Sequence, residues 1–126
     1  MVVLDTNIII DHLRRQPEKS LLIKIFKRIP EEVFAVSVVS IQELYEGKST
    51  RDEEKERHLL STLASLEILP YTTEVAKLAG TIARDLRKPI ELADAAIAAT
   101  TILNNAQLFT LNNKDFIGIK NLEFLT

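Results

Sequence analysis

The chain has 126 residues, a length that suits one domain burying roughly two thirds of its unfolded surface, so we expect no second domain. Its net charge of −2 provides no global positive field, and any nucleic-acid binding must depend on local patches or bound cations. The absence of cysteine excludes disulfides and thiolate metal sites and favours a reducing compartment. No apolar run approaches the roughly 20 residues of a membrane span, and the amino terminus lacks the basic lead of a signal peptide. We therefore expect a cytoplasmic protein that does not enter a membrane.

Strand and helix patterns alternate along the chain. Short β-branched runs indicate buried strands, and apolar residues at helical spacing indicate amphipathic helices between them. In chain order the patterns predict a strand over residues 2–4, helices over 8–14 and 19–28, a strand over 33–39, helices over 41–47 and 51–66, a strand over 67–69, helices over 72–88 and 91–103, and strands over 107–110 and 122–125. Alternating β and α elements favour a mostly parallel sheet with helices on both faces. The fold class is therefore α/β, with a single domain over residues 1–126.

Several short polar side chains are placed where helices begin. Thr6 can cap the first helix, and either Ser37 or Ser40 can cap the helix that runs to Gly47. The segment 91–103 is rich in alanine and apolar on nearly every side, which predicts a central helix.

Most acidic residues lie in evidently solvated stretches, but three do not. Asp5 follows an apolar strand, Glu43 lies one turn after the second strand, and Asp94 is flanked by apolar residues on every helical side. Burying an unpaired carboxylate costs several kcal/mol, so each of these positions needs a physical reason. Open α/β sheets bind ligands at the carboxyl ends of their strands, and the three acids can converge there.

Each of the three acids also has a purely structural explanation. Asp5 can cap the helix that follows it. Glu43 can be the acidic member of a capping box that begins at Ser40. Asp94 can complement the dipole at the start of its helix. Taken singly, none of the three positions distinguishes a binding site from a local structural role.

A cluster of carboxylates has a definite chemistry. Two unit charges 4 Å apart repel by roughly 4 kcal/mol at an effective dielectric constant near 20, so such a cluster needs a cation. Ligation by oxygen alone selects Mg²⁺ or Mn²⁺ over zinc. A hard cation of this kind binds a phosphodiester oxygen and helps to ionise an attacking water, which is the chemistry of phosphodiester hydrolysis. The two histidines, His12 and His58, lie among charged residues and are expected to be surface residues rather than catalysts.

Basic residues could supply a rim for phosphate groups. Long basic side chains at helix ends are also commonly just solvated, so both interpretations stand. The candidates are Arg14, Arg15, Lys48, Arg51 and Lys114.

Four segments, in their order and spacing, resemble the PIN-domain ribonucleases, and in this compact form the VapC-type toxins of toxin–antitoxin pairs. The segments are VVLDTNIIID, SVVSIQELYEG, ELADAAIAAT and LFTLNNKDF. The resemblance extends over nearly the whole chain, although residues 51–87 match only in helical pattern.

The resemblance implies a set of site residues. Asp5, Glu43 and Asp94 fall on the family's metal-binding acids, and Thr6 and Asn7 fall on its hydrogen-bonding pair after the first aspartate. For the fourth acid there are two candidates. Family members often have an acid two residues after the threonine that corresponds to Thr110, where this chain has Asn112, whereas Asp115 lies three residues further on. Asp115 is the predicted fourth ligand, and Asn112 is the alternative. The structural explanation of Asp115 is that it is an ordinary acid in a turn.

The function implied is that of a Mg²⁺- or Mn²⁺-dependent endoribonuclease, the toxin of a type II toxin–antitoxin pair. RNA would be its substrate, and a small antitoxin that lays a peptide against the active-site groove would be its partner. The protein would be a homodimer. The alternative is a catalytically inactive PIN-like scaffold that binds RNA or protein.

Two other enzyme classes also begin with an aspartate after the first strand. A haloacid-dehalogenase-like phosphatase needs a second aspartate two residues later, where this chain has Asn7. A phosphate-accepting receiver domain needs an aspartate after a middle strand, where this chain has the charged helix that begins at Arg51. Both classes therefore fail on residue placement.

Overall fold

The fold was analysed in a computed structural model that describes all residues, 1–126. Strands and helices alternate along much of the chain, as the sequence predicts. The strands are β1 (Val2–Leu4), β2 (Phe34–Ser37), β3 (Glu67–Leu69), β4 (Gln107–Phe109) and β5 (Glu123–Phe124). The α-helices are α1 (Thr6–Arg14), α2 (Leu21–Arg28), α3 (Val38–Glu46), α4 (Glu53–Leu63), α5 (Thr73–Asp85) and α6 (Leu92–Leu103). Short 3₁₀ helices form over Pro17–Lys19 (η1), Lys48–Arg51 (η2) and Asn113–Phe116 (η3).

The five strands form one sheet in the order β3-β2-β1-β4-β5, and every neighbouring pair is parallel. β1 lies at the centre, with β2 on one side and β4 on the other. Because all strands run in the same direction, their carboxyl ends meet at one edge of the sheet. The residues that follow β1, β2 and β4 are therefore brought to that edge.

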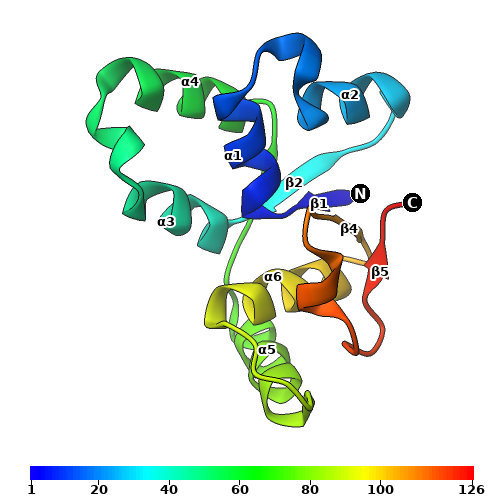
Figure 1. The fold of residues 1–126 in the computed structure, drawn as a ribbon. Coiled ribbons are helices and arrows are strands. Elements are labelled where there is room, and N and C mark those ends of the chain that lie inside the picture. The colour runs from blue at the N-terminus through cyan, green and yellow to red at the C-terminus, as the bar shows by residue number, and fades with distance from the viewer.

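Helices cover both faces of the sheet (Figure 1). Side chains alternate between the faces of a strand, so Val2 and Leu4 belong to one apolar cluster and Val3 to another. The first cluster also draws on α1, α2, α3 and α4, and the second draws on α6 and η3. Small residues such as Ala79 and Ala95 let α5 pack closely against α6. Of the helices, none combines the length and apolar character needed to span a membrane.

Several element boundaries differ from the predicted ones because a polar side chain caps the next helix. Asp5, rather than Thr6, is the N-cap of α1. Ser20 Oγ accepts a hydrogen bond from the backbone N–H of Ile23 at 3.2 Å, so α2 begins at Leu21 instead of residue 19. Ser37 Oγ accepts from the N–H of Val39 at 3.1 Å, which ends β2 and turns residues 38–39 into helix. A serine that satisfies free helix N–H groups outweighs the β preference of the following valines.

Candidate active site

Asp5 lies at the carboxyl end of the central strand and is buried. Its Oδ1 accepts a hydrogen bond from the backbone N–H of Thr6 at 2.8 Å, and its Oδ2 accepts one from the Thr110 hydroxyl at 2.7 Å. Burial raises the pKa of Asp5, the two hydrogen bonds act in the opposite direction, and the charge of Asp115 raises the pKa further. Asp5 therefore caps α1 and also lies near a second acid, Asp115.

Glu43 reaches this edge of the sheet from α3. The Thr6 hydroxyl donates to Glu43 Oε1 at 2.6 Å, and Thr6 Oγ1 also lies 2.8 Å from Ser40 Oγ. The helix is capped by Ser37, so Ser40 lies inside it and the capping-box explanation of Glu43 is wrong. Glu43 thus contacts the residue that directly follows Asp5 in the sequence.

Asp94 lies in the first turn of α6 and is half-buried. Its pKa is raised to about 6, mainly because burial disfavours the charged form, and then because of the negative charges of Asp5, Glu43, Asp115 and Glu91. A helix N-terminus alone favours the charged carboxylate and would lower the pKa of Asp94. The pKa of Asp94 is therefore shifted in the direction that burial and the neighbouring acids produce.

Asp115 is on η3, beyond the end of β4, and is exposed. Its charge is felt by both Asp5 and Asp94. Asn112 is also exposed, and its backbone N–H donates to the Thr110 hydroxyl oxygen at 3.0 Å. The structure therefore brings Asp5, Glu43, Asp94 and Asp115 into one electrostatic neighbourhood, while the choice between Asp115 and Asn112 as fourth ligand stays a prediction.

Thr110 is a site residue that the sequence did not single out. Its hydroxyl donates to Asp5 and accepts from Asn7 Nδ2 at 3.3 Å and from the N–H of Asn112. Asn7 Oδ1 in turn accepts from the N–H of Leu111 at 3.3 Å. Its signals in the sequence were its correspondence to a threonine of the PIN family and its position at the end of a predicted strand, which many threonines share. Thr110 connects the first strand's acid to the loop that carries Asn112 and Asp115.

The donor set fits a hard divalent cation in its chemistry. The acids offer only oxygen, and after burial the negative charges of neighbouring acids, which a cation would offset, also raise the pKa of Asp94. No three His, Asp or Glu side chains of the structure lie close enough together to hold a metal ion in their present conformation. Asp5, Glu43, Asp94 and Asp115 are the residues that could supply ligands.

The histidine prediction needs one correction. His58 is exposed as expected, but His12 is partly buried, with its Nδ1 2.8 Å from Ser20 Oγ and its ring centroid 5.3 Å from that of His58. Burial lowers the pKa of His12, and the nearby His58 lowers it further. His12 is partly buried because α1 packs against α2 and α4, which an adjacent charged residue in the sequence does not reveal.

The predicted basic rim divides into separate groups. Arg15 forms an ion pair with Asp11. Arg14 and Lys48 line a pocket of about 560 Å³ that also includes Glu43. Lys114 lines a different pocket of about 700 Å³ between the end of α5 and η3. Arg51 ends η2 and lines neither pocket.

The fold and the site together define a class: single-domain α/β proteins that gather carboxylates at the carboxyl edge of a parallel sheet. The PIN domain family model matches residues 2–122, and the chain belongs to this family. The resemblance found in the sequence segments is thereby confirmed.

Named relatives support the same assignment. The chain is 35% identical over 116 residues to ribonuclease VapC10 of Mycobacterium tuberculosis, covering 89% of this chain and 83% of the relative. It is 33% identical over 120 residues to ribonuclease VapC19 of the same organism, covering 92% of each chain.

Solved structures have the same fold. A chain of VapBC2 from Rickettsia felis, bound to a DNA fragment from its promoter, superposes with a TM-score of 0.85 at 27% identity, covering 99% of this chain and 98% of that one. A chain of VapBC-1 from nontypeable Haemophilus influenzae gives a TM-score of 0.82 at 26% identity, covering 99% and 97%. The predicted single α/β PIN-like domain is confirmed by these matches.

Proposed function

We propose that the protein is an endoribonuclease that hydrolyses RNA phosphodiester bonds, and that it is the toxin of a type II toxin–antitoxin pair. Membership of the PIN family and likeness to named VapC ribonucleases support the class of activity. The observation that carries the proposal for these particular residues is that Thr6, which directly follows Asp5, donates a 2.6 Å hydrogen bond to Glu43, while burial and the charges of Asp5, Glu43 and Asp115 raise the pKa of Asp94. A carboxylate whose pKa is perturbed by burial and by neighbouring charges is typical of a functional site.

In this proposal Asp5, Glu43, Asp94 and Asp115 hold Mg²⁺ or Mn²⁺. When bound, the cation supplies charge neutralisation for the phosphodiester and lowers the pKa of an attacking water. Asp5 is oriented through both of its oxygens, one by the Thr6 N–H and the other by the Thr110 hydroxyl. Such outer hydrogen bonds fix the direction in which a ligand's free lone pairs point.

Thr6 has a second role in this proposal. Its hydroxyl donates to Glu43, so one residue orients two of the proposed ligands, Asp5 through its N–H and Glu43 through its side chain. Exposed Asp115 is the most accessible of the four acids to a substrate arriving from solvent. No histidine is assigned a catalytic role in this proposal, although His58 lines the same pocket as Glu43.

The proposed partner is an antitoxin protein, because the sequence resembles the VapC-type toxins of toxin–antitoxin pairs and a solved structure of the same fold is described as a toxin–antitoxin complex from Klebsiella pneumoniae. The pocket of about 560 Å³ between α1, α3 and α4 offers apolar side chains beside Glu43, Arg14 and Lys48, which suits a peptide with both apolar and charged groups. We further propose that the toxin acts in the cytoplasm. We also propose that it is a homodimer, and light scattering of the purified protein can test the dimer.

Expression without a partner tests the function. The wild-type protein should slow the growth of a bacterial host and produce new RNA cleavage, while Asp94→Asn should do neither. The control is Glu74→Gln, which removes an exposed carboxylate from the first turn of α5, outside both pockets and the acidic edge, and should remain toxic.

The same activity should be measured with purified protein. Mg²⁺ or Mn²⁺ should restore RNA cleavage after EDTA treatment, and Ca²⁺ should support little turnover because its coordination is looser. Full cleavage in EDTA would contradict the metal mechanism. If neither the wild type nor Asp94→Asn slows growth, and extracts show no RNA cleavage, the toxin assignment is wrong. That result would favour the alternative, a scaffold that binds RNA or protein without cleaving. The relatives named as ribonucleases do not support this alternative.

A further inference from the structure

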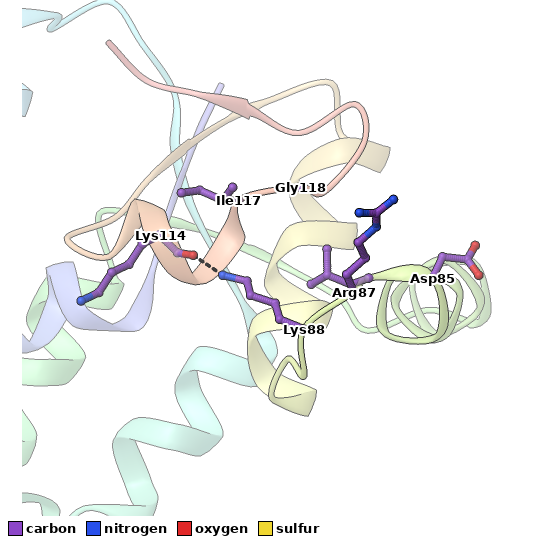
Figure 2. A pocket seen from close by; sticks show the side chains of 7 residues that line it. Asp85, Arg87, Lys88, Lys114, Ile117 and Gly118 are labelled. Carbon is purple, nitrogen blue, oxygen red and sulfur yellow. Dashed lines mark hydrogen bonds between the residues drawn. The ribbon is translucent and has the colours of Figure 1, made fainter.

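A pocket of about 700 Å³ opens between the carboxyl end of α5 and η3 (Figure 2). Its lining includes the cationic residues Arg87, Lys88 and Lys114, with Ile117 and Gly118 as the apolar and backbone part of the wall. We call these five residues the basic pocket. Ile117 is 62% exposed, so the apolar part of the wall is open to solvent.

The charge of the basic pocket is not neutralised within the chain. Its one acidic lining residue, Asp85, is already bound by Arg84 through two hydrogen bonds of 2.8 and 3.1 Å. Arg87, Lys88 and Lys114 form no ion pair with any carboxylate. Three cations without a carboxylate partner therefore line one pocket of a chain whose net charge is −2.

The basic pocket adjoins the candidate active site through η3. Lys88 Nζ donates a hydrogen bond to the backbone carbonyl of Lys114, which ties the loop after α5 to η3. Lys114 directly precedes Asp115 in that turn. Figure 2 shows the side chains of Lys114 and Arg87 pointing away from each other, so the cations are spread over the surface rather than focused on one point.

A polyanionic substrate needs such a surface in this protein. The acids at the sheet edge and the net charge of −2 repel RNA, and an attractive contribution must come from local cations. We infer that the basic pocket binds the backbone phosphates of single-stranded RNA next to the bond placed at the acids. Ile117 offers an apolar contact for the adjoining ribose or base. The inference rests on the proposed function, because it identifies where the RNA substrate binds beyond the acidic site.

Salt dependence of RNA binding distinguishes this pocket from an ordinary solvated surface. The probe is a fluorescein-labelled oligouridylate, titrated with the protein in EDTA so that cleavage does not interfere, and binding is followed by anisotropy at about 50 to 200 mM salt. Each cation that neutralises a phosphate of a single strand contributes about 0.7 to the slope of log K against log salt. The variants are Arg87→Gln and the double variant Arg87→Gln/Lys88→Gln.

We expect the slope to fall by about 0.7 in the single variant and by about 1.4 in the double variant. The control is Lys24→Gln/Lys27→Gln, which removes two exposed cations from α2 and should leave the slope unchanged. Lys88→Arg preserves the charge and should retain the wild-type slope. Thermal melting shows whether the loss of the Lys88 bond to Lys114 affects folding, and Arg87→Gln, which breaks no recorded hydrogen bond, tests the pocket independently.

The failure of this inference can be told from the failure of the proposed function. If the wild type cleaves RNA but Arg87→Gln binds with the wild-type slope, the basic pocket is not on the RNA path. If the wild type binds RNA with the expected slope changes but cleaves nothing with Mg²⁺ or Mn²⁺, the proposed activity is wrong and the pocket assignment stands. If the variants keep the RNA slope but lose affinity for an acidic peptide of a copurified partner, the pocket is a protein contact and the inference is overturned.

Discussion

Neutralising Asp94 should stabilise the metal-free protein. Asn has nearly the same size and shape as Asp, so Asp94→Asn removes a charge without opening a cavity. In the wild type, ionised Asp94 is half-buried and faces the charges of Asp5, Glu43 and Asp115. The variant should therefore have a higher free energy of unfolding at neutral pH whenever no cation is present.

The size of the effect follows from the pKa of Asp94, which is raised from 3.8 to about 6. At 1.36 kcal/mol per pH unit this difference corresponds to about 3 kcal/mol. Solvent still reaches part of the side chain and screens the repulsion, which reduces the expected gain to about 1 to 2 kcal/mol. For a domain of this size the melting temperature should rise by about 3 to 10 °C.

The sign of the pH dependence is also determined. Between pH 3.8 and about 6 the folded wild type holds a proton at Asp94 that the unfolded chain has released, so wild-type stability falls as the pH rises through this window. Asp94→Asn lacks this contribution. The two proteins should differ little near pH 4 and reach their full difference above about pH 7.

Thermal melts in EDTA and in excess Mg²⁺ test the reasoning. At a Mg²⁺ concentration 100-fold above Kd, binding adds about 2.7 kcal/mol to the free energy of unfolding of the wild type and less to that of the variant. The stability difference between the two proteins should therefore narrow or reverse. The control is Glu74→Gln, which removes a first-turn carboxylate from α5 outside the acidic edge and should produce a slight loss of stability through the helix dipole alone. If Asp94→Asn behaves like this control in EDTA and shifts in Mg²⁺ as much as the wild type does, Asp94 is not part of a metal site.

Two further substitutions test the remaining parts of the site. Asp115→Ala should reduce RNA cleavage much more than Asn112→Ala if the charge at position 115 completes the ligand set, and single-turnover rates that rank the two in the opposite order would transfer the role to Asn112. Thr110→Val removes the 2.7 Å hydrogen bond to buried Asp5 and should cost about 1 to 3 kcal/mol in the free energy of unfolding, together with a weaker apparent affinity for Mg²⁺ in cleavage assays. A stability loss with unchanged metal dependence would make Thr110 a structural residue only.

Local patterns were enough to predict most of the fold. The β-branched run before Asp5 predicts β1 because a buried parallel strand selects such residues, and the alanine-rich segment before Leu103 predicts α6 because it is apolar on nearly all sides. Boundaries were less certain, because residues with strand and helix preferences compete. Val38 and Val39 favour a strand, but the Ser37 hydroxyl satisfies the N–H of Val39 and starts α3 there.

Only those residues of the candidate site that are unusual beside their sequence neighbours could be predicted. Asp5 and Asp94 are conspicuous because a carboxylate among apolar neighbours needs an explanation. Thr110 is not conspicuous, because its role depends on a partner at a distant point of the sequence. His12 was expected at the surface, and its partial burial depends on the packing of α1 against two other helices, which no neighbouring residue encodes.

The central position of β1 has a consequence for synthesis of the protein. Of the five strands, β1 leaves the ribosome before the others, yet its partner β4 and the Thr110 hydroxyl that holds Asp5 come from a part of the sequence 105 residues later. Asp115 follows later still. A growing chain that ends before β4 has neither the strand nor the hydroxyl that orients the first acid, and contacts of such long sequence separation form late in folding. The acidic edge is therefore assembled only when nearly all of residues 1–116 are free to fold, so an unfinished chain cannot present the complete set of acids.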